Sequence, residues 1–376
     1  MKKAKLEEIE ILRGIAFLAV VLQHIIAGIF YQPGLSPLTL NVATTLLGLI
    51  RFAVPLFVFI TGVVLFYNYD AKVNYKDFLL KRFKQVIVPY LIWTVFYYAW
   101  VGFLSGVEAT STQDQLLDII QLAFTGKAAY HLWFMVMIIP FYLLFPFFKL
   151  LISKNRKWSI NLAVIAAVFV INLFLVYSLS KGMLTNDNPN LGFIFNYLDR
   201  NFLFWVFYFI LGGFVGLYYD HWKIFVRKTW VRVFSLLLLG ICMYDICFKI
   251  VRINNGVTDN PYLFSANVTA PLKPLMMITI LLLLLLVFVL AEKIAASRSY
   301  SANLLRSFGK YSFGAYLIHV FVLKIVNNLV ISYLSVLGVF MQTVISFVLC
   351  SLLSLILCIA ISRTKSSVGE VLVGRV

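Results

Sequence analysis

The chain has 376 residues, of which 62% are hydrophobic and only 12% are charged. A soluble globular domain carries roughly 25% charged residues, so this composition excludes a single water-soluble core and indicates a bilayer as the solvent. The net charge of +17 would suggest a nucleic-acid partner if it were taken alone.

The chain divides into ten apolar stretches separated by polar connections. A membrane-spanning helix needs about 20 predominantly apolar residues, and the stretches that meet this requirement are 9–30, 43–67, 85–104, 131–151, 158–178, 202–219, 231–251, 271–291, 312–334 and 338–361. The first stretch is longer than the ~7–15-residue apolar core of a cleaved signal peptide. We therefore predict an all-α polytopic membrane protein with about ten helices, in one integral-membrane domain over residues 1–376.

The connections alternate in charge along the chain. Cations gather in the N-terminal segment, in every second connection and in the C-terminal tail, whereas the intervening connections carry fewer. Short cationic loops stay in the cytoplasm, so ten spans predict that both termini are cytoplasmic in a multi-pass cell-membrane protein. The basic excess then follows from topology, and no nucleic-acid partner is needed to explain it.

The first stretch contains two ionisable residues, Arg13 and His24. They are eleven positions apart, just over three helical turns, so they project from nearly the same face and lie roughly 16 Å apart along the axis. Arg13 lies near the cytoplasmic end, where a snorkelling anchor is the alternative to a function. His24 lies deeper, where an ionisable side chain is costly and usually faces a bundle interior or a cavity. A structural hydrogen bond to a neighbouring helix is the alternative for His24.

Two further polar groups face the cytoplasmic side. Lys81 and Arg82 precede the third stretch, where they either anchor the helix or bind a phosphorylated ligand, for which Arg is better suited to bidentate contacts. Ser312, Tyr316 and His319 are spaced at i, i+4 and i+7 and so share a helical face. A polar packing seam between helices is the alternative for this second group.

The outer side and the second and sixth stretches carry weaker signals. His131 and Trp133 open the fourth stretch, where a solvated loop residue and the interfacial aromatic belt are the alternatives. Gly212 and Gly216 form a GxxxG pattern, which predicts close helix packing, and Gly62 similarly permits close approach.

The four cysteines lie in apolar runs without CxxC spacing, so we predict neither disulfides nor a zinc site.

Five segments, in order, resemble the membrane-bound acyltransferase 3 family. They are LRGIAFLAVVLQH (12–24) with its Arg–ten residues–His signature, VPLFVFITG (54–62), KRFKQVIVPY (81–90), HLWFM (131–135) and SFGAYLIH (312–319). The resemblance covers nearly the whole chain. Within the family it is similar to the branch that modifies surface polysaccharides in Gram-positive bacteria, which includes the poly-N-acetylglucosamine intercellular adhesion acyltransferases.

The resemblance implies that a cytoplasmic acyl-CoA donates an acetyl or succinyl group to a hydroxyl of an extracytoplasmic glycan. Acyl-CoA is then a cosubstrate, and neither a permanently bound cofactor nor a metal is implied. By analogy His24 is the catalytic base or a transient acyl carrier, and Arg13 helps to bind the donor. We assign Arg82, Lys81, Ser312, Tyr316 and His319 to the donor side, and His131 and Trp133 to the acceptor side.

Two other functions remain open at the level of sequence. A transporter or flippase for a lipid-linked or polymeric sugar would also line a pathway with polar groups, although the inverted repeats typical of transporters are not evident. A non-catalytic partner in a polysaccharide synthase complex would need no ionisable pair on one helical face. A homo-oligomer is equally open, as are the acyl group and the acceptor hydroxyl.

Overall fold

The computed structural model describes residues 6–32, 34–69, 74–106, 111–184, 197–256, 266–364 and 367–374. Every regular element in these ranges is helical, which confirms the predicted all-α fold. In chain order the elements are α1 (Glu7–Ile29), α2 (Pro37–Ile50), α3 (Ala53–Asn68), α4 (Tyr75–Arg82), η1 (Phe83–Ile87), α5 (Val88–Ser105), α6 (Thr112–Thr125), α7 (Trp133–Leu143), α8 (Phe145–Leu151), α9 (Trp158–Ser180), η3 (Leu198–Arg200), η4 (Phe202–Phe204), α11 (Val206–Leu217), α12 (Tyr219–Arg227), α13 (Thr229–Gly256), α15 (Pro274–Ala295), α16 (Tyr300–Tyr333), α17 (Val339–Arg363) and α18 (Ser367–Leu372).

The described helices account for the predicted membrane spans. Eight helical segments are long and apolar enough to cross a membrane, and the bent pair α7–α8 makes a ninth. The predicted span 202–219 contains α11, which has only 12 residues. The chain is thus a multi-pass membrane protein, and the cytoplasmic location of its termini stays a prediction.

The predicted span 131–151 is not one straight helix. It breaks at Leu144, where α7 and α8 meet at 62°. Pro146, in the first turn of α8, has no N–H to continue the hydrogen-bond ladder of α7. The Lys149 ammonium, near the end of α8, donates to the carbonyl of Tyr69 at 2.6 Å and ties α8 to the end of α3.

Glycines set how closely the central helices pack. A Cβ atom added to Gly62 or Gly212 would collide with a backbone carbonyl of the opposite helix, so α3 and α11 touch through their backbones. The same holds for α1 and α16 at Gly14 and Gly309. The close packing predicted from the small residues is therefore confirmed, because no larger side chain fits at these crossings.

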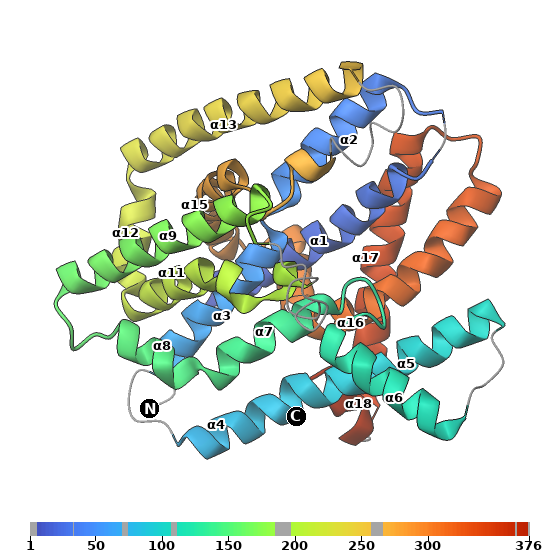
Figure 1. Ribbon diagram of the computed structural model, residues 1–376, viewed down its shortest axis with the longest axis horizontal. Helices are drawn as coiled ribbons and strands as arrows, with labels where there is room; N and C mark the ends of the chain where they lie inside the picture. Colours follow the sequence, from blue (N-terminus) through green and yellow to red (C-terminus); the bar gives the residue numbers. More distant parts are fainter. Residues whose placement is uncertain are drawn as a thin grey trace.

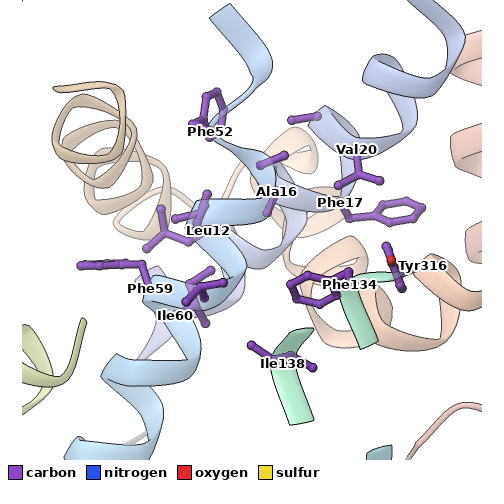
Figure 2. Packing of buried hydrophobic residues seen from close by; sticks show 14 of the residues in the cluster. Leu12, Ala16, Phe17, Val20, Phe52, Phe59, Ile60, Phe134, Ile138 and Tyr316 are labelled. Carbon is purple, nitrogen blue, oxygen red and sulfur yellow. The ribbon is translucent and has the colours of Figure 1, made fainter. Parts of the chain in front are cut away.

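Helix α1 crosses the middle of the bundle, with α13 along one edge and α4 and α5 along the other (Figure 1). It is among the most buried of the spans, whereas α9 and α13 leave most of their apolar residues exposed, as lipid-facing helices do. Figure 2 shows where α1 meets α3, α7 and α16. The side chains gathered there include Leu12, Ala16, Phe17, Val20, Phe59, Ile60, Phe134, Ile138 and Tyr316.

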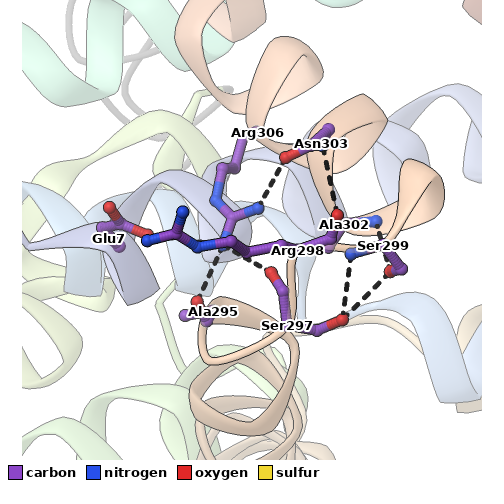
Figure 3. A network of polar contacts seen from close by, with 8 residues as sticks. All are labelled: Glu7, Ala295, Ser297, Arg298, Ser299, Ala302, Asn303 and Arg306. Atoms are coloured by element: carbon purple, nitrogen blue, oxygen red, sulfur yellow. Dashed lines mark hydrogen bonds and ion pairs between the residues drawn. The ribbon is translucent and has the colours of Figure 1, made fainter.

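Polar contacts join several helix ends on one side of the molecule. The Arg306 guanidinium on α16 donates to the carbonyls of Ala295 and Ser297 and pairs with Glu7 at 3.3 Å (Figure 3). Lys223 on α12 pairs with Glu8 at 2.6 Å. These contacts bring the start of α1, the start of α16, the end of α15 and α12 to the same side, which carries the cations that the charge pattern assigns to the cytoplasm.

Candidate active site

Two pockets lie in line along the same helices. The first, which we call the Arg13 pocket, has a volume of about 260 Å³ and is lined by residues of α1, α3, α7, α16 and the η1 turn. The second, the His24 pocket, has a volume of about 620 Å³ and is lined by α1, α5, α16 and residues 128–130. Because α1 carries Arg13 into one pocket and His24 into the other, the helix connects the two sites.

Three cations, Arg13, Arg82 and Lys310, line the Arg13 pocket. The guanidinium of Arg82 lies 5.4 Å from the ring centroids of both Phe78 and Tyr142, and its buried Nε has no hydrogen-bond partner among the described residues. A guanidinium with free donors is suited to a carboxylate or phosphate, which a planar fork of N–H groups binds bidentately. The three cations therefore make the pocket suited to an anionic ligand.

The backbone next to Arg82 is unusual. Residues Phe83–Ile87 form a π-helical turn between α4 and α5. A π turn inserts one residue into the helical repeat, and such turns are frequent at functional sites. In this chain the turn brings Gln85 and Val86 to the pocket wall beside Arg82.

Helix α16 supplies the opposite wall through Ser312 and Tyr316. The Ser312 hydroxyl donates to the Gly309 carbonyl at 2.9 Å, which leaves its lone pairs free to accept. Tyr316 is only 5% exposed, and its hydroxyl donates to the backbone carbonyl of His131. Its ring therefore separates the Arg13 pocket from the residues beyond it.

Beyond Tyr316 lie three of the four histidines of the chain, His24, His131 and His319, which we call the histidine cluster. The rings of His24 and His319 stack with centroids 5.3 Å apart, and those of His131 and His319 meet edge to face at 4.9 Å. Tyr316 lies 5.2 Å from the ring of His131 and 5.6 Å from that of His319. Helices α1 and α16 and the turn before α7, which are far apart in the sequence, thus bring three imidazoles to one place.

The hydrogen bonds of His319 fix its tautomer. Its Nδ1 lies 2.5 Å from the carbonyl oxygen of Tyr316, and a carbonyl only accepts, so Nδ1 carries the proton. Its Nε2 is then a lone-pair acceptor, buried and without a hydrogen-bond partner among the described residues. A buried acceptor left unpaired is rare and costly, which makes the cluster a candidate for proton transfer. No group of His, Cys, Asp or Glu in the described part of the chain is placed to hold a metal ion.

His24 also lines the His24 pocket, so the cluster reaches the second cavity through this residue. The ring of Tyr130 packs at 4.8 Å from that of His24, at the wall of the pocket. Tyr97 is buried beside His131 at 5.3 Å and donates to the carbonyl of Leu317 at 2.8 Å. Tyr130 thus packs directly against His24, whereas Tyr97 contacts the cluster through His131.

Several predicted site residues lie elsewhere than the sequence suggested. Lys81 is exposed and is not part of the Arg13 pocket lining, whereas its neighbour Arg82 is. His319 lies in the histidine cluster rather than in the Arg13 pocket. His131 is 1% exposed in the same cluster, whereas Trp133 packs against Trp205 at 5.8 Å and lines neither pocket.

Other residues of the two pockets were not predicted. Lys310 lies inside the segment that precedes SFGAYLIH, and a cation at that position was a usable signal. Tyr130 is the neighbour of His131 in the sequence, so it too was within reach. Val373 and Gly374, which close one side of the Arg13 pocket, lie in a C-terminal segment that carries no recognisable pattern.

Comparison with known proteins gives a consistent assignment. The family model for the acyltransferase domain matches residues 6–363. The chain is 25% identical over 287 residues to a probable poly-beta-1,6-N-acetyl-D-glucosamine export protein of Staphylococcus aureus (strain MRSA252), covering 75% of this chain and 74% of that protein. A protein of the same name from Staphylococcus epidermidis is 25% identical over 243 residues, 63% of each chain. No solved structure matches the chain at a significant level. Since the family model spans nearly its whole length, the chain belongs to the acyltransferase domain family.

Proposed function

We propose that this membrane protein moves an acetyl or succinyl group from cytoplasmic acyl-CoA to a hydroxyl of an extracytoplasmic glycan. The observation that carries the proposal is the order of its parts along α1 and α16. An anion-binding pocket comes first, the histidine cluster follows, and a second pocket begins at His24.

The Arg13 pocket holds the donor in this proposal. Arg13, Arg82 and Lys310 offer charge for the phosphates of CoA, and Ser312 offers a hydroxyl. Arg13 and His24 are separated by roughly 16 Å of helix axis, which suits an extended donor that has its phosphates at one end and its thioester at the other. Acyl-CoA is consumed as a cosubstrate, so the site needs no resident cofactor.

The reaction balances with His24 as the only proton carrier. In a direct transfer, His24 takes the proton of the glycan hydroxyl while the hydroxyl oxygen bonds to the thioester carbon. The C–S bond then breaks, and the imidazolium returns the proton to the CoA thiolate. In a two-step transfer, the unprotonated ring nitrogen of His24 attacks the thioester carbon, the C–S bond breaks, and the proton of the other ring nitrogen passes to the CoA thiolate. The glycan hydroxyl then attacks the acyl carbon, the C–N bond breaks, and the hydroxyl proton returns to the imidazole. General-base catalysis contributes typically about 10²–10⁴-fold to such a rate.

The names of the relatives support a surface glycan as the acceptor, because the matched staphylococcal proteins are named for the polymer poly-beta-1,6-N-acetyl-D-glucosamine. Those names also call the proteins exporters, which favours polymer transport as a second candidate. The space between the two pockets is filled by His131, His319 and Tyr316, which are 1%, 0% and 5% exposed. A closed partition suits the passage of an acyl group better than the passage of a polymer.

One experiment separates the two candidates. A strain that lacks the gene is complemented with the wild-type chain or with His24→Ala at equal membrane abundance. Both the ester content of the surface polymer and its exported amount are measured. We expect the variant to export polymer without ester groups. Full ester content with His24→Ala would overturn the catalytic role, and polymer retained inside the cell would support the transporter.

A further inference from the structure

The His24 pocket is built from three matching helical stripes. Helix α1 contributes His24, Ala27 and Gly28, with Tyr31 in the turn that follows it. Helix α5 contributes Tyr97, Trp100, Val101 and Leu104, and α16 contributes Val320, Leu323, Lys324 and Asn327. Each stripe follows the i, i+3 or i+4, i+7 spacing of one helical face. The three helices run in the same direction, because the same chain segments line the Arg13 pocket at their earlier residues. The pocket therefore leads along three parallel helix faces to His24 at its inner end.

The walls of this pocket combine rings with hydrogen-bonding groups. Trp100 meets Phe321 edge to face at 5.0 Å, and Tyr130 packs on His24 at 4.8 Å. Aromatic rings offer flat apolar faces at low entropic cost, which suits the apolar faces of pyranose rings. The Asn327 amide adds a donor and an acceptor for sugar hydroxyls.

The charge carried by the pocket lining is positive. Lys324 is the only Lys, Arg, Asp or Glu among the described residues that line the pocket. Arg51, in the break between α2 and α3, lies within electrostatic range of the His24 imidazole, and its buried Nε has no hydrogen-bond partner among the described residues. A cationic ligand would meet like charge with no carboxylate among the described lining residues to balance it, and juxtaposed like charges suppress binding.

We propose that the His24 pocket is a saccharide-binding site that accepts neutral or anionic sugars and rejects sugars that carry free amines. This inference rests on the proposed function for the identity of the acceptor, and it narrows that function. The hydroxyls of an amino-sugar polymer would have to be O-acylated while its amines still carry N-acetyl groups. Removal of the N-acetyl groups would have to come afterwards.

Binding measured without an acyl donor tests this inference separately from the transfer reaction. Purified protein in lipid nanodiscs is titrated with three tetrasaccharides: N-acetylglucosamine units, the same sugar after N-deacetylation, and one containing uronic acids. We expect the deacetylated sugar to bind at least about fivefold more weakly than the other two. Trp100→Ala should weaken binding of all three, and Lys324→Glu should reverse the order between the cationic and the anionic sugar.

Two further variants keep the outcome interpretable. Lys181→Glu changes an exposed cation outside the pocket and should leave all three affinities unchanged. Lys324→Gln removes the charge without reversing it, so it still tests the role of the charge if the glutamate variant does not fold. Equal affinity for the three sugars, or no response to Lys324→Glu in a folded protein, would overturn the proposal. If the deacetylated sugar binds most weakly, as expected, while His24→Ala still acylates glycan, only the proposed catalytic function fails.

Discussion

His24 on α1 and His319 on α16 stack with their ring centroids 5.3 Å apart and their planes inclined by 28°. Since the Nδ1 proton of His319 is directed at the Tyr316 carbonyl, the ring nitrogen of His319 that remains available inside the cluster is the acceptor Nε2. We therefore propose that His319 positions His24 rather than binding the donor, and this difference has a kinetic signature.

We expect His319→Gln to lower kcat by at least about tenfold and to shift the pH profile, because the stacked partner of His24 is lost. The KM for acyl-CoA should change little, since His319 lies outside the Arg13 pocket. Initial rates against donor concentration and pH check this in proteoliposomes. His221→Ala, at an exposed histidine on α12, is the matched control. A raised KM with an unchanged kcat would instead return His319 to the donor-binding role predicted from sequence.

Arg82 should act through the planar geometry of its guanidinium. We expect Arg82→Ala to raise the KM for acyl-CoA about tenfold or more, with a smaller effect on kcat. Arg82→Lys should restore little, because an ammonium cannot make the bidentate contact or stack between Phe78 and Tyr142. Lys84→Ala removes an exposed cation from the adjoining turn and serves as the control. Full recovery with lysine would show that the pocket needs charge alone.

Tyr316 should limit the size of the acyl group, since its ring stands between the Arg13 pocket and the histidine cluster. We expect Tyr316→Ala to widen the range of accepted donors toward longer acyl chains, at some loss of rate with acetyl-CoA. Tyr316→Phe keeps the ring but removes the hydrogen bond to the His131 carbonyl, so it should preserve the size limit. Rates with acetyl-, butyryl- and hexanoyl-CoA measure the effect. An unchanged donor preference in Tyr316→Ala would contradict the role of the ring.

The fold was largely predictable because the bilayer imposes simple rules on the sequence. A span needs a certain length of apolar residues. This rule predicted ten spans, and eight described helical segments, or nine with the bent pair α7–α8, are long and apolar enough to cross a membrane. The break at Leu144 was not predicted, although Pro146 offered the signal. The shared face of Arg13 and His24 was also accessible, since helical periodicity relates residues on one helix.

The histidine cluster itself could not be predicted from periodicity, because it joins residues of two helices, α1 and α16, and of the turn before α7. His131 was expected at the outer opening, and nothing in its own segment shows that residues 128–132 fold inward against α16. Lys81 and Arg82 were assigned together, although neighbouring residues point to different sides of a helix. Tertiary packing decides such questions, and in this chain it depends on glycine contacts such as the one at Gly309.

That contact gives a stability prediction. A Cβ atom on Gly309 would overlap the Glu10 carbonyl, so Gly309→Ala must push α16 away from α1. We expect a loss of roughly 1–3 kcal/mol, the usual cost of overpacking, seen as a lower melting temperature in detergent. Gly240→Ala, where a Cβ meets nothing within 4 Å, is the matched helical control and should be neutral or stabilising. Equal melting temperatures for the two variants would contradict the close packing.

The C-terminal segment should contribute to donor binding, although it lies outside the spans. Val373 is only 4% exposed and lines the Arg13 pocket together with Gly374, and the Trp93 indole on α5 donates to the Leu372 carbonyl at 3.1 Å. We expect a chain that ends after residue 364 to insert and fold, but with a raised KM for acyl-CoA, because one wall of its pocket is missing. Trp93→Phe, which loses only the hydrogen bond, should show a smaller effect in the same direction. Donor titrations on both variants check this, and an unchanged KM in the shortened chain would show that the wall is dispensable.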